Sequence, residues 1–187
     1  MIPDRMTRYT FDEAIDQAEA SPGPLGVKQL ADEIRKVLAD GAVDVIYRDR
    51  VLSGRSRQYK LPRVSPDSHV EIVHTLLGIE LKIGKRRLLC PDYATARYLS
   101  IFARLGGGPV AVPYDITVIS AIADEMESGL QRMLLLAELR TRERSSRIKV
   151  LVKRRLATVV SAGVASLGAG SMFPEFAAPP RRKRSAK

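Results

Sequence analysis

The sequence predicts a single α/β domain over residues 25–139, in which helices cover a central mixed sheet of four or five strands. Of its 187 residues, 45% are hydrophobic and 28% are charged. This balance allows a sizeable core and excludes a wholly disordered chain. Apolar residues recur at helical spacing over residues 27–38. Residues 79–83 instead alternate strictly between aliphatic and charged side chains, as in a strand with one buried face.

Residues 1–24 are expected to form an N-terminal arm that contains one short helix. Thr10 and Glu13 have the spacing of a capping box, which predicts a helix over residues 11–20. The Ser-Pro-Gly-Pro sequence of residues 21–24 ends this helix and acts as a linker. The first residues lack the apolar run of a signal peptide, so the cytoplasm is the expected compartment.

The first helix of the domain is expected over residues 25–40, with Gly41 as its end. Glu33 falls at the edge of its apolar stripe, where its carboxylate could reach around the rim of the surface on which the helix packs. The run of β-branched residues over 43–47 predicts a strand. A basic segment over residues 48–63 follows, interrupted by glycine and proline.

Three further strands are expected over residues 69–77, 79–83 and 86–90, the last two joined by a two-residue turn. A helix over residues 92–105 follows, and three consecutive glycines end it. The domain is expected to finish with a short buried strand at 109–113 and a long helix, capped by Asp115 or Thr117, to about residue 139. The apolar stripe of the long helix is expected to form core or a dimer surface.

The positive charge lies almost wholly in residues 140–187. This part contains 13 Lys and Arg residues and only two acidic ones, whereas residues 1–139 have a net charge of −1. Such an asymmetry points to nucleic acid or an acidic membrane surface as partner. We expect a basic helical extension here, ending in a disordered basic tail. The uncharged residues 156–174 are rich in Ala, Gly and Ser, which argues against a membrane span.

Cysteine and histidine contribute little to the expected chemistry. Cys90 is the single cysteine, so an internal disulfide and a cysteine-based zinc cluster are excluded. The two histidines, His69 and His74, lie in a predicted strand and are expected to be strand residues rather than ligands. A metal ion, if bound, must therefore be held by carboxylate oxygens.

Two carboxylates and a lysine form the strongest candidate for a catalytic site. If residues 69–77 and 79–83 pair as antiparallel strands, Asp67 and Glu80 can converge. Two converging carboxylates bind a hard divalent cation such as Mg²⁺. Lys82 projects from the same face as Glu80 and could orient a metal-bound water or offset charge on a scissile phosphate.

This pattern, Asp67 followed by Glu80-x-Lys82, resembles the PD-(D/E)xK nuclease superfamily, and the order of elements is similar to archaeal Holliday junction resolvases. The resemblance covers about residues 27–113. It implies a Mg²⁺-dependent, resolvase-like DNA endonuclease that hydrolyses phosphodiester bonds, in which Asp67 and Glu80 bind the metal and Lys82 supports catalysis. It further implies a contribution from Glu33. Two copies would be natural if both DNA strands are cut.

Other interpretations remain open for the same residues. A Glu-x-Lys pair on an amphipathic strand is most common as a plain solvent face, and Pro-Asp is a common turn dipeptide. The chain would then be a non-catalytic nucleic-acid-binding or scaffold protein that binds phosphates through its basic C-terminal region. A third interpretation is an assembly module that buries residues 119–137 and 156–172 against a partner. The residues expected to contact nucleic acid are Arg48, Arg50, Arg55, Arg57, Lys60, Lys153, Arg154, Arg155, Arg181, Arg182, Lys183 and Arg184.

Overall fold

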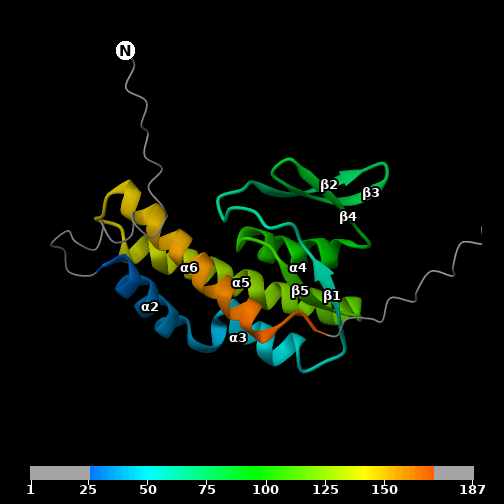
Figure 1. The fold of residues 1–187 in the computed structure, drawn as a ribbon, viewed down its shortest axis with the longest axis horizontal. Helices are drawn as coiled ribbons and strands as arrows, with labels where there is room; N and C mark the ends of the chain where they lie inside the picture. Colours follow the sequence, from blue (N-terminus) through cyan, green and yellow to red (C-terminus); the bar gives the residue numbers. More distant parts are fainter. Residues whose placement is uncertain (1–25, 171–187) are drawn as a thin grey trace, which may run out of the picture.

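The computed structural model describes residues 26–170 as four long helices and five strands with short helical turns (Figure 1). The helix expected over residues 11–20 and the C-terminal tail lie outside the described residues. The elements are α2 (Val27–Leu38), η1 (Ala39–Gly41), α3 (Val43–Ile46), η2 (Tyr47–Val51), β1 (Ser56–Lys60), β2 (Val70–Thr75), β3 (Gly78–Ile83), β4 (Arg86–Cys90), α4 (Tyr93–Arg104), β5 (Pro109–Pro113), α5 (Ile116–Arg140) and α6 (Ser146–Leu167).

The α/β class is confirmed, but the strands form two antiparallel sheets instead of one mixed sheet. Within residues 26–170, β1 pairs with β5, and β2, β3 and β4 form a separate sheet in that order. Helix α4 packs against β2 and β3 and also against α5, so it lies between the larger sheet and the helical layer (Figure 1). The expectation of four or five strands in one sheet was therefore wrong for the described part of the chain.

Two buried tyrosines explain why β5 does not join a larger sheet. The Tyr98 hydroxyl donates to the carbonyl of Ala111 at 2.7 Å, and the Ala111 N–H donates to the Tyr47 hydroxyl at 2.8 Å. The Tyr47 hydroxyl itself donates to the carbonyl of Gly168 at 2.7 Å. Side chains thus satisfy both backbone groups of Ala111, at the centre of β5, which a further strand would need. Burial raises the pKa of both Tyr47 and Tyr98, so both hydroxyls stay protonated donors.

Residues 43–47 are helical, so the strand expected there was wrong. They form α3 and the start of η2. Val43, Ile46, Tyr47 and Val51 are all buried, at spacings of three and four residues. This is the period of a helix, and it outweighs the strand propensity of the β-branched side chains because it places all four in one core.

The other predicted elements are confirmed with small shifts at their ends. Strands β2, β3 and β4 form the expected meander, and α4 ends before the three glycines. Asp115 caps α5, since its carboxylate accepts a hydrogen bond from the N–H of Thr117 at 2.8 Å. Asp92 caps α4 in the same way through the N–H of Thr95, at 2.7 Å.

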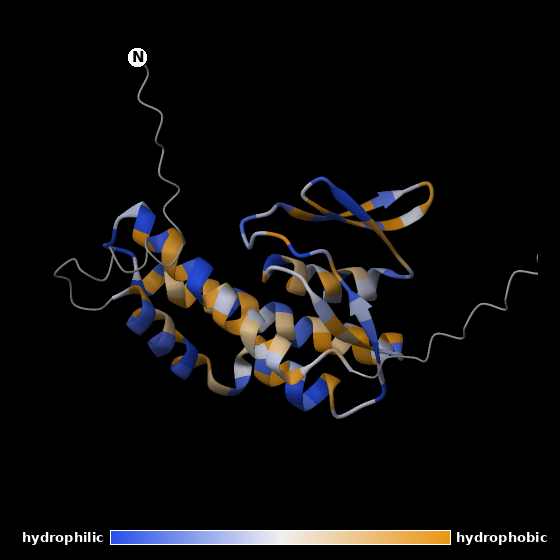
Figure 2. Cartoon of the chain, in the orientation of Figure 1, coloured by the Kyte–Doolittle hydropathy of each residue, from blue (hydrophilic) through white to orange (hydrophobic). Residues whose placement is uncertain are grey.

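Helix α6 continues without a break from the basic residues 147–155 into the uncharged segment that follows, as far as Leu167. Its N-cap is Ser145, and it packs against α2, α3 and α5. Figure 2 shows apolar and polar stretches alternating along α5 and α6, as expected of helices that bury one face. Of the helices between residues 26 and 170, none is both long and apolar enough to cross a membrane.

Candidate nucleic-acid interface

The four residues of the predicted catalytic site lie on three different segments, with only Glu80 and Lys82 sharing one, β3, and each has its own ion-pair partner. Glu33 on α2 binds Arg140 at the end of α5, with 3.1 Å between the charged atoms. Asp67, in the turn before β2, binds Arg154 of α6 at 2.5 Å. These two ion pairs direct both carboxylates toward the helical layer.

Glu80 and Lys82 lie on the outer face of the β2–β3–β4 sheet, the face that points away from α4. The intervening Leu81 is fully buried on the inner face. Glu80 binds Arg87 of β4 at 3.4 Å, and its side chain is 14% exposed. Lys82 faces its cross-strand neighbour Glu71 with 3.7 Å between charged atoms. The Glu-x-Lys pattern therefore forms cross-strand ion pairs on the face away from the core.

The structure does not bring Asp67 and Glu80 together. In the ladder, Glu80 lies opposite Val73, three positions from the Val70–Ile83 pair that is nearest to Asp67. Three positions along a strand correspond to about 10 Å. Across residues 26–170, no group of three or more His, Cys, Asp or Glu side chains could hold a metal ion. Magnesium binding by these two carboxylates thus remains a prediction of the sequence alone.

Several of the arginines predicted to bind nucleic acid are already engaged. Arg48 binds Asp49 at 2.7 Å and Arg50 binds Glu125 at 3.0 Å. The guanidinium of Arg57 lies over the ring of Tyr114, 5.9 Å from its centroid. Arg55 is exposed just before β1, and Arg155 is half-buried on α6. The four cations at positions 181–184 lie outside the described residues.

The remaining predicted residues, Lys60, Lys153 and Arg154, line a basic groove that follows residues 60–67. The groove consists of three adjoining hollows of about 880, 370 and 240 Å³. The first and second share Arg63, and the second and third share Pro66. Among the described residues, its charged lining consists of seven cations, Lys60, Arg63, Arg86, Arg87, Arg104, Lys153 and Arg154, and one carboxylate, Asp67.

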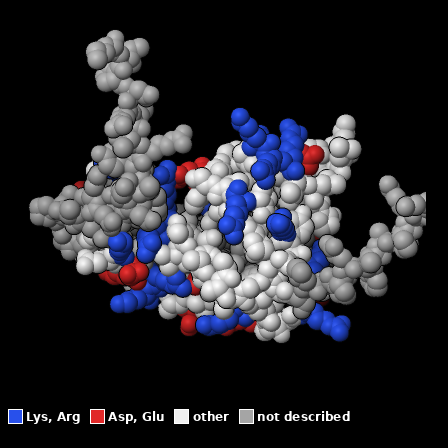
Figure 3. All heavy atoms as spheres, viewed as in Figure 1, with Lys and Arg blue, Asp and Glu red and all other residues white. Residues whose placement is uncertain are grey.

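Figure 3 shows one face of this surface, on which basic side chains gather over the β2–β3–β4 sheet and in the region between that sheet and α6. Arg63, Arg86, Arg87 and Arg104 are the groove residues that the sequence-based prediction omitted. Arg63 belongs to the basic segment over residues 48–63, which was a usable signal. The other three come from the start of β4 and the end of α4, and only the fold brings them to the groove.

The glycines after α4 hold one wall of the groove against the segment that carries Arg63. Leu61 donates its N–H to the carbonyl of Gly108, and Val64 donates to the carbonyl of Gly106, both at 3.0 Å. Gly107 has a φ of 71°, and a Cβ added there would lie 2.1 Å from the carbonyl oxygen of Pro62. Glycine is therefore required at this position both by backbone conformation and by close approach.

Comparison with known proteins gives no assignment: no family model, curated protein or solved structure matches the chain. The groove and the placement of charge around it are therefore the features that indicate function.

Proposed function

We propose that this protein is a non-catalytic nucleic-acid-binding module that holds the phosphate backbone of duplex DNA in its basic groove. The observation that carries this proposal is a groove lined by seven cations and a single carboxylate within residues 60–154, with four cations in the first hollow, three in the third, and Arg63 shared between the first and the middle one. Polyanion binding needs such a track, because each cation that neutralises a phosphate releases a condensed counterion.

Five of the seven cations are available for phosphates. Arg87 and Arg154 are bound to Glu80 and Asp67, respectively. The others, within the part of the chain that the structure describes, have no ion-pair partner; they are Lys60, Arg63, Arg86, Arg104 and Lys153. A basic C-terminal tail would add to this surface.

The aromatic content of the groove favours a duplex over a single strand. Single-stranded nucleic acids are bound by aromatic side chains on which the bases stack. The lining residues of the three hollows include one aromatic, Phe102, which is only 3% exposed. Among the described residues, the groove is lined by cations and has no exposed aromatic side chain. Such a lining suits the regularly spaced phosphates of a double helix.

The test is the binding of a fluorescent 20-base-pair duplex, measured by anisotropy in EDTA over a range of salt concentrations. We expect binding without metal, and a plot of log K against log salt with a slope of about −4.5, as for five phosphate contacts. The single strand of the same length should bind more weakly. A slope near zero, or preference for the single strand, would contradict the proposal.

DNA cleavage is a separate hypothesis. It rests on the resemblance to PD-(D/E)xK nucleases, because the positions of Glu33, Asp67, Glu80 and Lys82 do not support it. Incubation of branched and linear DNA with Mg²⁺ tests it. Cleavage that is lost in both Glu80→Ala and Lys82→Ala would restore the nuclease hypothesis.

A further inference from the structure

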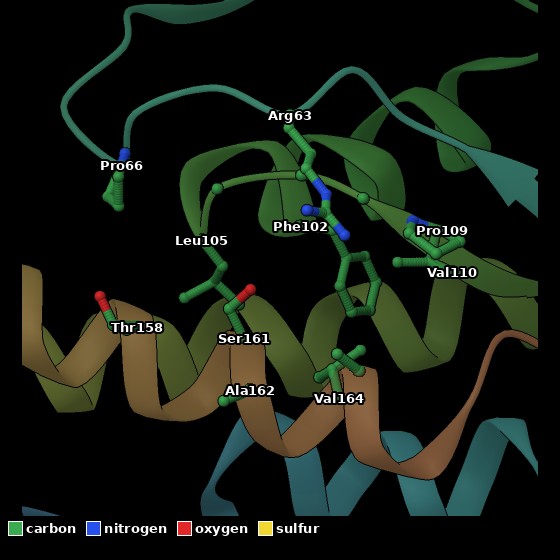
Figure 4. A pocket seen from close by; sticks show the side chains of 14 residues that line it. Arg63, Pro66, Phe102, Leu105, Pro109, Val110, Thr158, Ser161, Ala162 and Val164 are labelled. Atoms are coloured by element: carbon green, nitrogen blue, oxygen red, sulfur yellow. The ribbon is translucent and has the colours of Figure 1, made fainter.

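The middle hollow of the basic groove differs from its neighbours in size and lining. It lies between residues 62–66, the Gly106–Gly108 turn and one face of α6, and its volume is about 370 Å³ (Figure 4). Pockets for small molecules usually have about 300 to 1,000 Å³. We call this hollow the central pocket.

The wall and floor of the central pocket are mostly apolar. Phe102, Leu105, Val110 and Val164 line it, and all four are buried. They come from α4 and its end, from β5 and from α6. Such a lining favours the burial of an apolar group.

One charged side chain enters this apolar space. Figure 4 shows Arg63 reaching down from the segment above, with its guanidinium group over the pocket and close to Phe102. Among the described residues, Arg63 has no ion-pair partner. It is also the only charged residue between positions 26 and 170 that lines the central pocket.

Two hydroxyl groups lie on the α6 side. Thr158 donates its hydroxyl to the carbonyl of Arg154 at 2.9 Å, so its donor is already used. The Ser161 hydroxyl has no hydrogen-bond partner within residues 26–170 and lines the same pocket. The central pocket therefore offers one guanidinium group and one free hydroxyl beside an apolar floor.

We propose that the central pocket binds a small molecule with an apolar body and a single carboxylate, which pairs with Arg63 and accepts a hydrogen bond from Ser161. A guanidinium group matches a carboxylate in charge and in bidentate geometry. A dianionic phosphate would leave one charge uncompensated beside the apolar floor, which is unfavourable.

This ligand would also regulate the DNA binding proposed above, because Arg63 belongs to the basic groove. A carboxylate bound to Arg63 removes that cation from the phosphate track and places a ligand in the middle of the groove. This second statement rests on the proposed function, whereas binding of the ligand does not.

The experiment uses 1-naphthoate and its neutral counterpart 1-naphthylmethanol, titrated calorimetrically into the full-length chain. We expect saturable one-to-one binding of naphthoate, at least tenfold tighter than that of the alcohol. Arg63→Gln should weaken naphthoate at least tenfold and leave the alcohol unchanged. Ala162→Phe, which fills the pocket from the exposed side of α6, should abolish binding of both. Arg55→Gln removes the same charge from an exposed position outside the pocket and should change neither.

Equal binding of the acid and the alcohol, or naphthoate binding that survives both pocket variants, would overturn the proposal. A duplex-binding assay at constant ionic strength tests the regulatory statement, with acetate as the control anion. If naphthoate binds but does not displace DNA, the regulatory statement is wrong, whereas the proposal that the central pocket binds a carboxylate is supported. If the chain binds no DNA, the proposed function is wrong, and the titration still decides the pocket.

Discussion

Replacement of both Lys60 and Arg63 with glutamine is expected to weaken duplex binding about 30-fold, equivalent to about 1 kcal/mol for each lost phosphate contact. Both side chains are exposed and line adjoining hollows of the basic groove. The salt slope should become shallower by about two, because two fewer counterions are released. Fluorescence anisotropy with the 20-base-pair duplex measures both quantities.

The matched control is the double variant Arg48→Gln with Arg50→Gln, which removes the same charge from the same basic segment. These arginines are bound to Asp49 and Glu125 outside the groove. Exposed ion pairs of this kind contribute only about 0 to 1 kcal/mol to stability, so the control should fold normally. Its duplex affinity should change less than threefold, because salt largely screens the interaction of these two exposed charges outside the groove with the DNA. Equal losses in the two double variants would show that net charge, and not the groove, controls binding.

Replacement of Gly107 with alanine is expected to lower the free energy of unfolding by about 3 to 4 kcal/mol. A left-handed backbone costs a non-glycine residue about 1 to 2 kcal/mol. The added Cβ would also lie 2.1 Å from the carbonyl oxygen of Pro62, so the turn must move away from the segment that carries Arg63. That movement breaks the two backbone hydrogen bonds between residues 61–64 and the glycine turn, each worth about 1 kcal/mol.

Gly84→Ala provides the control for backbone strain alone. Gly84 has a φ of 57°, and a Cβ added there meets no atom within 4 Å. This variant should therefore lose only the backbone cost of about 1 to 2 kcal/mol. Urea denaturation of both variants measures the difference. Equal losses at Gly84 and Gly107 would show that close approach of the turn to Pro62 does not stabilise the groove wall.

Most local elements could be predicted from the sequence because local patterns determine them. The strict alternation of residues 79–83 places Leu81 and Ile83 in the core, as expected. The residue types at positions 115 and 117 predict a helix cap there, and Asp115 provides it. The strand expected at residues 43–47 was wrong because these apolar side chains fit both the two-residue period of a strand and the period of a helix. Only the burial of Tyr47 and Val51 shows that the helical period applies.

The sheet topology could not be predicted from these patterns. Another strand can pair with β5 only if the backbone groups of β5 on that side are free to form hydrogen bonds. Here the hydroxyls of Tyr47 and Tyr98 are already hydrogen-bonded to the N–H and C=O of Ala111 in β5. These tyrosines lie 64 and 13 residues from their partner, so no local pattern reveals the contact.

The candidate site was predicted only in part for a similar reason. The spacing of Asp67, Glu80 and Lys82 describes a shared site only if their side chains meet, and side-chain direction depends on which sheet face is buried. Lys60, Lys153 and Arg154 are the groove cations that the sequence-based prediction included. The other cations reach the groove through packing of β4, α4 and α6 around the segment at 60–67.

The duplex affinity of Asp67→Asn, measured with and without Mg²⁺, tests most directly whether cations or carboxylates are central to function. Asp67 is the one carboxylate that lines the groove within the described residues, and it binds Arg154. Its neutralisation should free Arg154 for a phosphate, so that the duplex binds about fivefold tighter, equivalent to about 1 kcal/mol, and neither protein cuts DNA. If the unaltered protein cuts the duplex in Mg²⁺ and Asp67→Asn abolishes cleavage, Asp67 acts as a metal ligand and the proposal of a non-catalytic DNA-binding module is wrong.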